Sequence, residues 1–76
     1  MITIYGKDQC GFCTMAEALC KNNNYEYVYL KLDTDYQKEL ITDNYPTART
    51  FPVVLIGEEY IGGFKELQTW HKTQGE

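Results

Sequence analysis

Two cysteines at positions i and i+3 are the residues of this sequence whose types and spacing are best suited to chemistry. They lie in Cys10-Gly11-Phe12-Cys13, after an apolar segment that ends at Gly6 and at the start of a helical pattern. Neighbours on one helical turn can form a disulfide with little backbone movement. The free amides and the dipole of a helix N-terminus stabilise an anion, which favours the thiolate of Cys10. We therefore predict reversible thiol–disulfide chemistry in which Cys10 reacts first and Cys13 second.

A zinc site is the alternative use of a Cys-x-x-Cys pair, and it needs two further ligands. Cys20 and His71 are the remaining candidates, and their spacing matches no usual zinc finger or ribbon. Cys20 falls on the apolar face of the predicted helix, where a cysteine is usually a small buried side chain. We interpret Trp70 and His71 as residues that pack or cap in the last helix rather than as catalytic ones. We therefore expect no bound metal.

The elements that must position the cysteine pair follow from the hydrophobic pattern. A buried strand is predicted over 1–5, and an amphipathic helix over 11–21 that three asparagines end. Residues 25–32 alternate tyrosines with aliphatic side chains, which predicts a strand that is apolar on both faces and covered by helices. Strands at 51–56 and 60–61 follow later in the chain.

The remaining elements complete a β-α-β-α-β-β-α order. Asp33, Thr34 and Asp35 provide N-cap chemistry for a second helix over 36–43, and a last helix spans 64–72. The first strand-helix-strand unit predicts a right-handed parallel crossover, and the tight turn before Tyr60 predicts an antiparallel pair. The expected fold class is α/β, with a four-stranded mixed sheet flanked by three helices.

Composition restricts the classes of function. A chain of 76 residues predicts one domain spanning 1–76. Its 11 acidic and 7 basic residues leave a net charge of −4, which disfavours nucleic-acid binding. The longest apolar runs are too short for a membrane helix or a signal peptide. Three cysteines, an odd number, favour a reducing compartment over a secreted disulfide scaffold. We expect a cytoplasmic protein that contacts neither nucleic acid nor membrane.

Four separated motifs are spread along nearly the whole chain. In chain order these are Lys7-Asp8-Gln9-Cys10-Gly11-Phe12-Cys13, Ala48-Arg49-Thr50-Phe51-Pro52, Gly57-Glu58-Glu59-Tyr60-Ile61-Gly62-Gly63-Phe64 and Glu66-Leu67. They resemble the glutaredoxin family of the thioredoxin-like superfamily. The motifs are similar to that family's Lys-x-x-Cys-x-x-Cys active site, its cis-proline segment, its Gly-Gly turn, and the acidic-apolar step after that turn.

The resemblance implies that glutathione is a co-substrate held beside Cys10. A cis bond before Pro52 would leave the backbone of the preceding residue free to pair with the tripeptide. Cations would bind its glycine carboxylate, and helix amides after the Gly-Gly turn would receive its γ-glutamyl end. The implied set is Lys7, Phe12, Arg49, Thr50, Phe51, Pro52, Gly63, Phe64, Lys65 and Glu66. Phe12, Phe51 and Lys65 depart from the residues most common in the family.

The resemblance implies an enzyme that reduces protein disulfides and glutathione mixed disulfides through a Cys10/Cys13 dithiol. It further implies a monomer that carries electrons and serves cell redox homeostasis. Disulfide-containing proteins would be its partners, with ribonucleotide reductase as a typical recipient. Two alternatives stay open. Cys-Gly-Phe-Cys differs by one residue from the Cys-Gly-Phe-Ser of glutaredoxins that bind a [2Fe–2S] cluster with glutathione. The same cysteines could also serve a redoxin that thioredoxin reductase reduces without glutathione.

Overall fold

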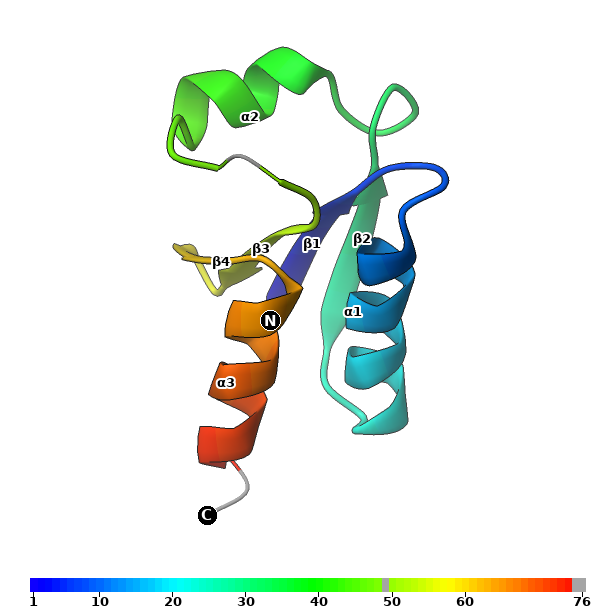
Figure 1. Cartoon of the computed structure of the whole chain (residues 1–76), viewed down its shortest axis with the longest axis vertical. Helices are drawn as coiled ribbons and strands as arrows, with labels where there is room; N and C mark the ends of the chain where they lie inside the picture. The colour runs from blue at the N-terminus through cyan, green and yellow to red at the C-terminus, as the bar shows by residue number, and fades with distance from the viewer. Residues whose placement is uncertain (49, 75–76) are drawn as a thin grey trace.

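The computed structural model describes residues 1–48 and 50–74 and has the predicted order of elements (Figure 1). The elements are β1 (Ile2–Gly6), α1 (Gly11–Asn22), β2 (Tyr27–Lys31), α2 (Lys38–Asn44), β3 (Val53–Ile56), β4 (Glu59–Gly62) and α3 (Phe64–Gln74). Among these residues, no helix is long and apolar enough to cross a membrane.

The four strands form one mixed sheet in the order β2-β1-β3-β4. β1 is parallel to β2, with Ile4 opposite Tyr29, and antiparallel to β3, with Ile4 opposite Val54. β3 and β4 form the predicted antiparallel pair, with a register shift between Val54 and Leu55. The prediction of a thioredoxin-like mixed sheet is therefore confirmed, and the strand bearing the active-site loop lies in the middle of the sheet.

The sheet separates two apolar clusters, and α2 lies apart from α1 and α3 (Figure 1). The α1 and α3 side contains the buried residues Ile2, Ile4, Ala16, Cys20, Val54 and Leu67. The α2 side contains Tyr36, Ile41, Val53 and Leu55. The predicted alternation of the second strand is confirmed for its tyrosines, which pack on the first cluster, and for Leu30 and Leu32, which pack on the second. Val28, the remaining aliphatic residue of the strand, is exposed, so that face is not fully covered. α1 and α3 thus bury one face against the sheet, whereas α2 contributes one buried residue, Ile41, to the second cluster.

The segment predicted to begin the second helix forms a turn instead. We expected residues 33–35 to cap a helix over 36–43, but α2 begins at Lys38. The Asp35 carboxylate accepts a hydrogen bond from the backbone N–H of Lys31 at 2.9 Å. Acidic side chains can bond to nearby backbone groups outside helices, and here that local bond prevails over helix capping.

The other predicted boundaries lie within two residues of the observed ones. β2 begins at Tyr27, and the N–H of Tyr25 instead donates to the carbonyl of Cys20 in the last turn of α1 at 3.0 Å. β3 begins at Val53, directly after Pro52, which has no N–H to give to a strand ladder.

Candidate active site

Cys10 is the N-cap residue of α1, and its sulfur takes part in the cap. The residue has extended backbone angles (φ −120°, ψ 103°), and its Sγ accepts a hydrogen bond from the Cys13 N–H at 3.2 Å. The two cysteines form a disulfide with their Cα atoms 5.3 Å apart. This is the pairing that the i, i+3 spacing favours.

The two sulfurs differ in accessibility. Cys10 is half-buried, whereas Cys13 is fully buried. The first turn of α1, all of which is described, contains no acidic residue. A thiolate on Cys10 would therefore meet helix amides and the positive end of the dipole without a carboxylate in the same turn. The difference in accessibility favours Cys10 over Cys13 as the sulfur that reacts first.

The loop before β3 brings Phe51 and Pro52 to the active-site loop. The Phe51–Pro52 peptide bond is cis, as the resemblance implied. The Lys7 ammonium lies 5.2 Å from the centroid of the Phe51 ring, within the range of a cation–π contact. Lys7, from the loop after β1, is therefore held against the loop before β3. Arg49, the other predicted cation, lies outside the described residues.

The Gly-Gly turn begins α3 and lies against Pro52. A Cβ built on Gly63 would lie 3.3 Å from the Pro52 carbonyl oxygen, and Gly62 has a φ of +132°, which favours glycine. The Glu66 carboxylate accepts a hydrogen bond from the Gly63 N–H at 2.8 Å. Glu66 therefore caps its own helix, in addition to the ligand-binding role that the resemblance implied for it.

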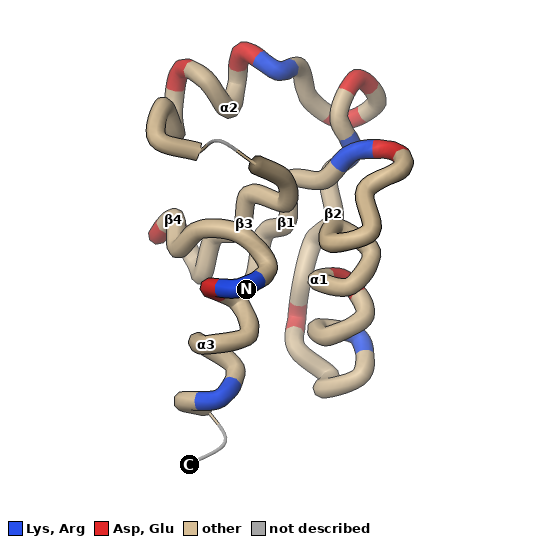
Figure 2. Tube along the Cα trace, viewed as in Figure 1, with Lys and Arg blue, Asp and Glu red and all other residues tan. Residues whose placement is uncertain are grey.

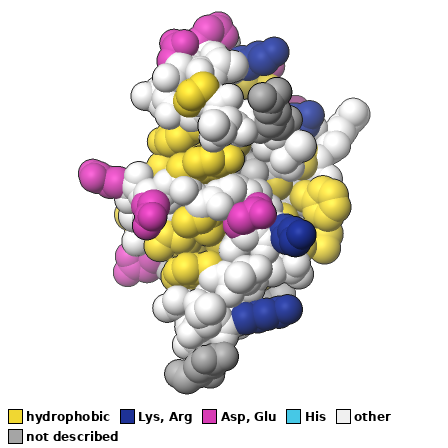
Figure 3. Space-filling model, turned by 60° about the vertical axis from the view of Figure 1, so that its left-hand side comes forward, with side chains coloured by type: hydrophobic (Ala, Val, Ile, Leu, Met, Phe, Trp, Pro, Cys, Tyr) yellow, Lys and Arg dark blue, Asp and Glu magenta, His cyan; other side chains and the backbone are white. Residues whose placement is uncertain are grey.

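A groove of about 500 Å³ joins these segments. Phe12 and Phe64 face each other across α1 and α3 with stacked rings, 6.0 Å between centroids. Hydrophobic side chains lie at the surface beside acidic and basic ones in Figure 3. The lining residues are Phe12, Met15, Thr50, Phe51, Gly63, Phe64, Lys65, Glu66 and Gln68.

Most of the predicted ligand-binding residues line this groove, and two further residues were not predicted. Met15 lies one helical turn beyond Phe12, and Gln68 lies one turn beyond Lys65. The i+3 spacing along each predicted helix was the available signal. Lys7 and Pro52 are not among the lining residues, although both belong to the adjoining loops.

The third cysteine is separate from this chemistry. Cys20 is fully buried, and burial, with a smaller contribution from Glu17, raises the pKa of its thiol to about 11. The predicted core position of Cys20 is confirmed. The described residues contain no group of three or more His, Cys, Asp or Glu side chains able to hold a metal ion. His71 packs as predicted, with its Nδ1 2.6 Å from the Tyr25 hydroxyl.

Comparison with known proteins agrees with this geometry. The sequence model of the glutaredoxin family matches residues 2–61. Mitochondrial glutaredoxin-2 of Pongo abelii is 30% identical over 74 residues, which cover 93% of this chain and 46% of the relative. The chain thus spans about half the length of the relatives that it matches, the human protein included.

Two solved structures share the fold. Glutaredoxin 1 of Francisella tularensis, complexed with cacodylate, is 26% identical with a TM-score of 0.77, covering 99% of this chain and 96% of that one. The buckwheat glutaredoxin–glutathione complex is 25% identical with a TM-score of 0.81, covering 96% and 69%. Taken with the disulfide at the start of α1 and the cis-proline beside it, these matches show that the chain belongs to the glutaredoxin family.

Proposed function

We propose that this protein is a glutathione-dependent thiol–disulfide oxidoreductase. The family and the fold support thiol–disulfide oxidoreduction. The observation that carries the proposal is the position of Cys10, whose sulfur accepts the Cys13 amide at the start of α1 while remaining partly accessible. Such an environment stabilises a thiolate, which is the reactive form of cysteine.

The first step is attack by the Cys10 thiolate on a disulfide. The target is a protein disulfide or a mixed disulfide between a protein and glutathione. A new sulfur–sulfur bond forms to Cys10, the old bond breaks, and the leaving sulfur departs as a thiolate that takes a proton from water. The Cys13 N–H that bonds the Cys10 sulfur helps to hold the attacking anion in place.

The second step resolves the covalent intermediate. With a protein disulfide, the Cys13 sulfur attacks Cys10 and expels the reduced protein, leaving the Cys10–Cys13 disulfide that the structure contains. Two molecules of reduced glutathione then convert this disulfide to two thiols and become one oxidised glutathione. With a glutathione adduct on Cys10, a second glutathione resolves the intermediate directly. The burial of Cys13 favours an intramolecular role.

The groove beside the disulfide is the proposed glutathione site. The backbone amides that follow Gly63 would bind the γ-glutamyl carboxylate of glutathione, and the backbone of Phe51 would pair with its cysteinyl residue. Lys7 would bind the glycine carboxylate of glutathione. The buckwheat glutaredoxin–glutathione complex supports this assignment. Protein disulfides are the proposed second substrates, with ribonucleotide reductase a first candidate. We further propose that a monomer acts in a reducing compartment such as the cytoplasm.

The test compares two sources of electrons. Turnover of a glutathione mixed disulfide is measured with glutathione and glutathione reductase, and separately with thioredoxin reductase. We expect turnover in the first system and loss of that turnover in Cys10→Ser, while Cys20→Ala, the matched control, remains active. Turnover with thioredoxin reductase alone would contradict the dependence on glutathione. Full activity in Cys10→Ser would contradict the assignment of the nucleophile.

A further inference from the structure

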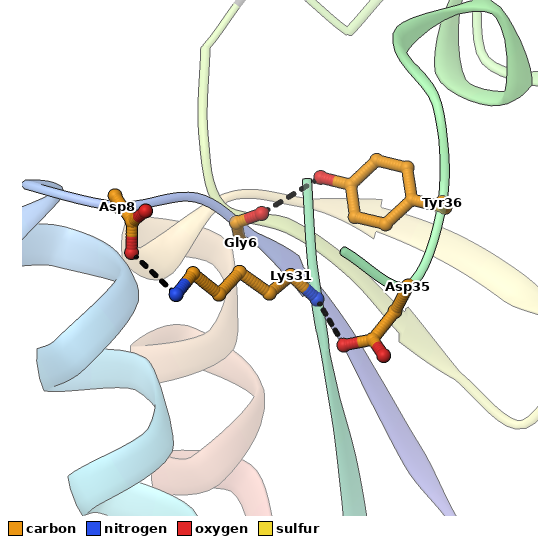
Figure 4. A network of polar contacts seen from close by, with 5 residues as sticks. All are labelled: Gly6, Asp8, Lys31, Asp35 and Tyr36. Atoms are coloured by element: carbon orange, nitrogen blue, oxygen red, sulfur yellow. Dashed lines mark hydrogen bonds and ion pairs between the residues drawn. The ribbon is translucent and has the colours of Figure 1, made fainter. Parts of the chain in front are cut away.

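An ion pair ties the loop before Cys10 to the end of the neighbouring strand. The Lys31 ammonium lies 2.8 Å from the Asp8 carboxylate (Figure 4). Lys31 is the last residue of β2, and Asp8 lies two positions before Cys10. Figure 2 shows basic and acidic residues next to each other in the loop between β1 and α1, close to the end of β2. The pair therefore links the end of β2 to the loop that leads into Cys10.

Two further hydrogen bonds join the segments next to this ion pair. The backbone N–H of Lys31 donates to the Asp35 carboxylate at 2.9 Å, and the Tyr36 hydroxyl donates to the backbone carbonyl of Gly6 at 2.8 Å (Figure 4). Burial raises the pKa of Tyr36 to about 12, so its hydroxyl remains a donor at neutral pH. These bonds hold the end of β2 next to the start of the active-site loop. Lys31, the partner of Asp8, is therefore held in place.

The position of Asp8 matters because two anions compete for one helix terminus. The N-terminus of a helix stabilises nearby anions, and Asp8 lies only two residues before Cys10, the N-cap of α1. A free Asp8 carboxylate would also oppose the negative charge of a Cys10 thiolate. The ion pair directs this carboxylate toward β2 instead. Both partners are exposed, with 42% and 75% of their side chains accessible, so the pair contributes little to stability.

The other charged groups around Cys10 come from several elements. Lys7 precedes Asp8 in the same loop and lies over Phe51. Lys65 and Glu66 line the groove from the first turn of α3. The first turn of α1 has no acidic residue, and Thr50 and Phe51 are the uncharged groove residues from the loop before β3. Asp8 is thus the acidic side chain nearest to Cys10 in sequence, and Lys31 is its partner.

We propose that Lys31 is a positioning residue for the Cys10 nucleophile: by pairing with Asp8, it keeps this carboxylate from the N-terminus of α1 and so preserves the thiolate of Cys10. The inference rests on the proposed function, because it takes Cys10 as the nucleophile. It assigns a role in reactivity to a residue outside all four motifs of the resemblance. The hydrogen bond from Lys31 to Asp8 also raises the pKa of the lysine, so its ammonium remains charged at neutral pH.

The test measures the pH at which Cys10 ionises. In a Cys13→Ser background, the rate of Cys10 alkylation by iodoacetamide is followed against pH by mass spectrometry of the Cys10 peptide. We expect Lys31→Gln to raise the pKa of Cys10 by on the order of half a unit, which is the size of effect that one exposed charge in the neighbourhood produces. Adding Asp8→Asn should restore the original value, and Lys31→Arg, which keeps the pair, should retain it.

The matched control is Lys21→Gln, which removes the same charge from the last turn of α1, far from Cys10. An equal rise in Lys21→Gln and Lys31→Gln, or no restoration in the double variant, would overturn the proposal. Circular dichroism confirms that each variant is folded. A Cys10 that ionises near the ordinary cysteine value of about 8.5 before any change at Lys31 would overturn the proposed function itself, and this inference with it.

Discussion

The backbone amide of Cys13 donates a hydrogen bond to the sulfur of Cys10 across 3.2 Å. The donor belongs to the main chain, so it does not depend on the side chain of Cys13. Within the disulfide the bond caps α1, and after reduction the same amide would stabilise the proposed Cys10 thiolate. The side chain of Cys13 and the stabilisation of Cys10 can therefore be separated by mutation.

Cys13→Ser should separate the two reactions of the proposed cycle. The variant keeps the amide donor, so exchange between glutathione and a mixed disulfide should proceed at a rate within a few-fold of the wild type. Reduction of an intramolecular protein disulfide should fall strongly, because the buried sulfur that resolves the intermediate is gone. Both rates are measured on the same preparation. Equal loss of both activities would contradict separate roles for the two cysteines.

Glu66→Ala should weaken both α3 and the proposed glutathione site. The change removes the carboxylate that accepts the Gly63 N–H at 2.8 Å, and loss of a helix cap costs about 1 kcal/mol. The free energy of unfolding should fall by this amount in urea titrations, and the KM for glutathione should rise. Glu58→Ala, which removes an exposed carboxylate from the β3–β4 turn, is the control. Matching results for the two variants would count against the cap.

Gly6→Ala should destabilise the start of the active-site loop. A Cβ on Gly6 would overlap the Tyr29 hydroxyl, and overpacking of this kind costs roughly 1–3 kcal/mol. The urea midpoint should fall accordingly. Gly11→Ala is the matched control, because a Cβ there meets no atom within 4 Å and alanine favours a helix. Unchanged stability in Gly6→Ala would show that Tyr29 moves away without cost.

Cys20 should reduce stability at alkaline pH. Burial raises the pKa of its thiol from 9.0 to about 11, so above pH 9.0 the unfolded chain loses a proton that the folded chain keeps. The ionisation of Cys20 should therefore lower the free energy of unfolding between these values, and its own contribution is at most about 1.4 kcal/mol per pH unit. Tyr36, whose pKa burial raises to about 12, extends the decline to higher pH.

The measurement compares oxidised wild type with oxidised Cys20→Ala across this pH range, since the Cys10–Cys13 disulfide does not titrate. Cys20→Ala should show a lower free energy of unfolding at neutral pH, owing to lost packing, but a shallower decline as the pH rises. The same slope in both proteins would mean that Cys20 ionises alike in the folded and unfolded chains.

The sequence predicted the order of elements and the main active-site segments because both depend on short-range patterns. Alternation over 25–32 and the helical spacing after Cys10 are local signals, and the structure confirms both. The predicted start of α2 was wrong because the Asp35 carboxylate, expected to cap the helix, instead accepts a hydrogen bond from the backbone N–H of Lys31 at the end of β2. Propensity alone does not decide between two local hydrogen bonds.

The contacts that sequence analysis missed join segments far apart in the chain. Lys31 and Asp8 meet only because β1 and β2 are parallel neighbours. Met15 and Gln68 line the groove only because α1 and α3 lie on the same side of the sheet. The ligand-binding roles carried by the resemblance stay predictions, including that of Arg49, which lies outside the described residues.

The most direct test of the account is the site at which glutathione becomes attached. Cys13→Ser is incubated with oxidised glutathione, and the intact mass and proteolytic peptides are measured before and after addition of reduced glutathione. We predict one glutathione per chain, on Cys10, that reduced glutathione removes, with buried Cys20 unmodified. Attachment to Cys20, or no adduct on Cys10, would contradict the assignment of Cys10 as the nucleophile of a glutathione-dependent enzyme.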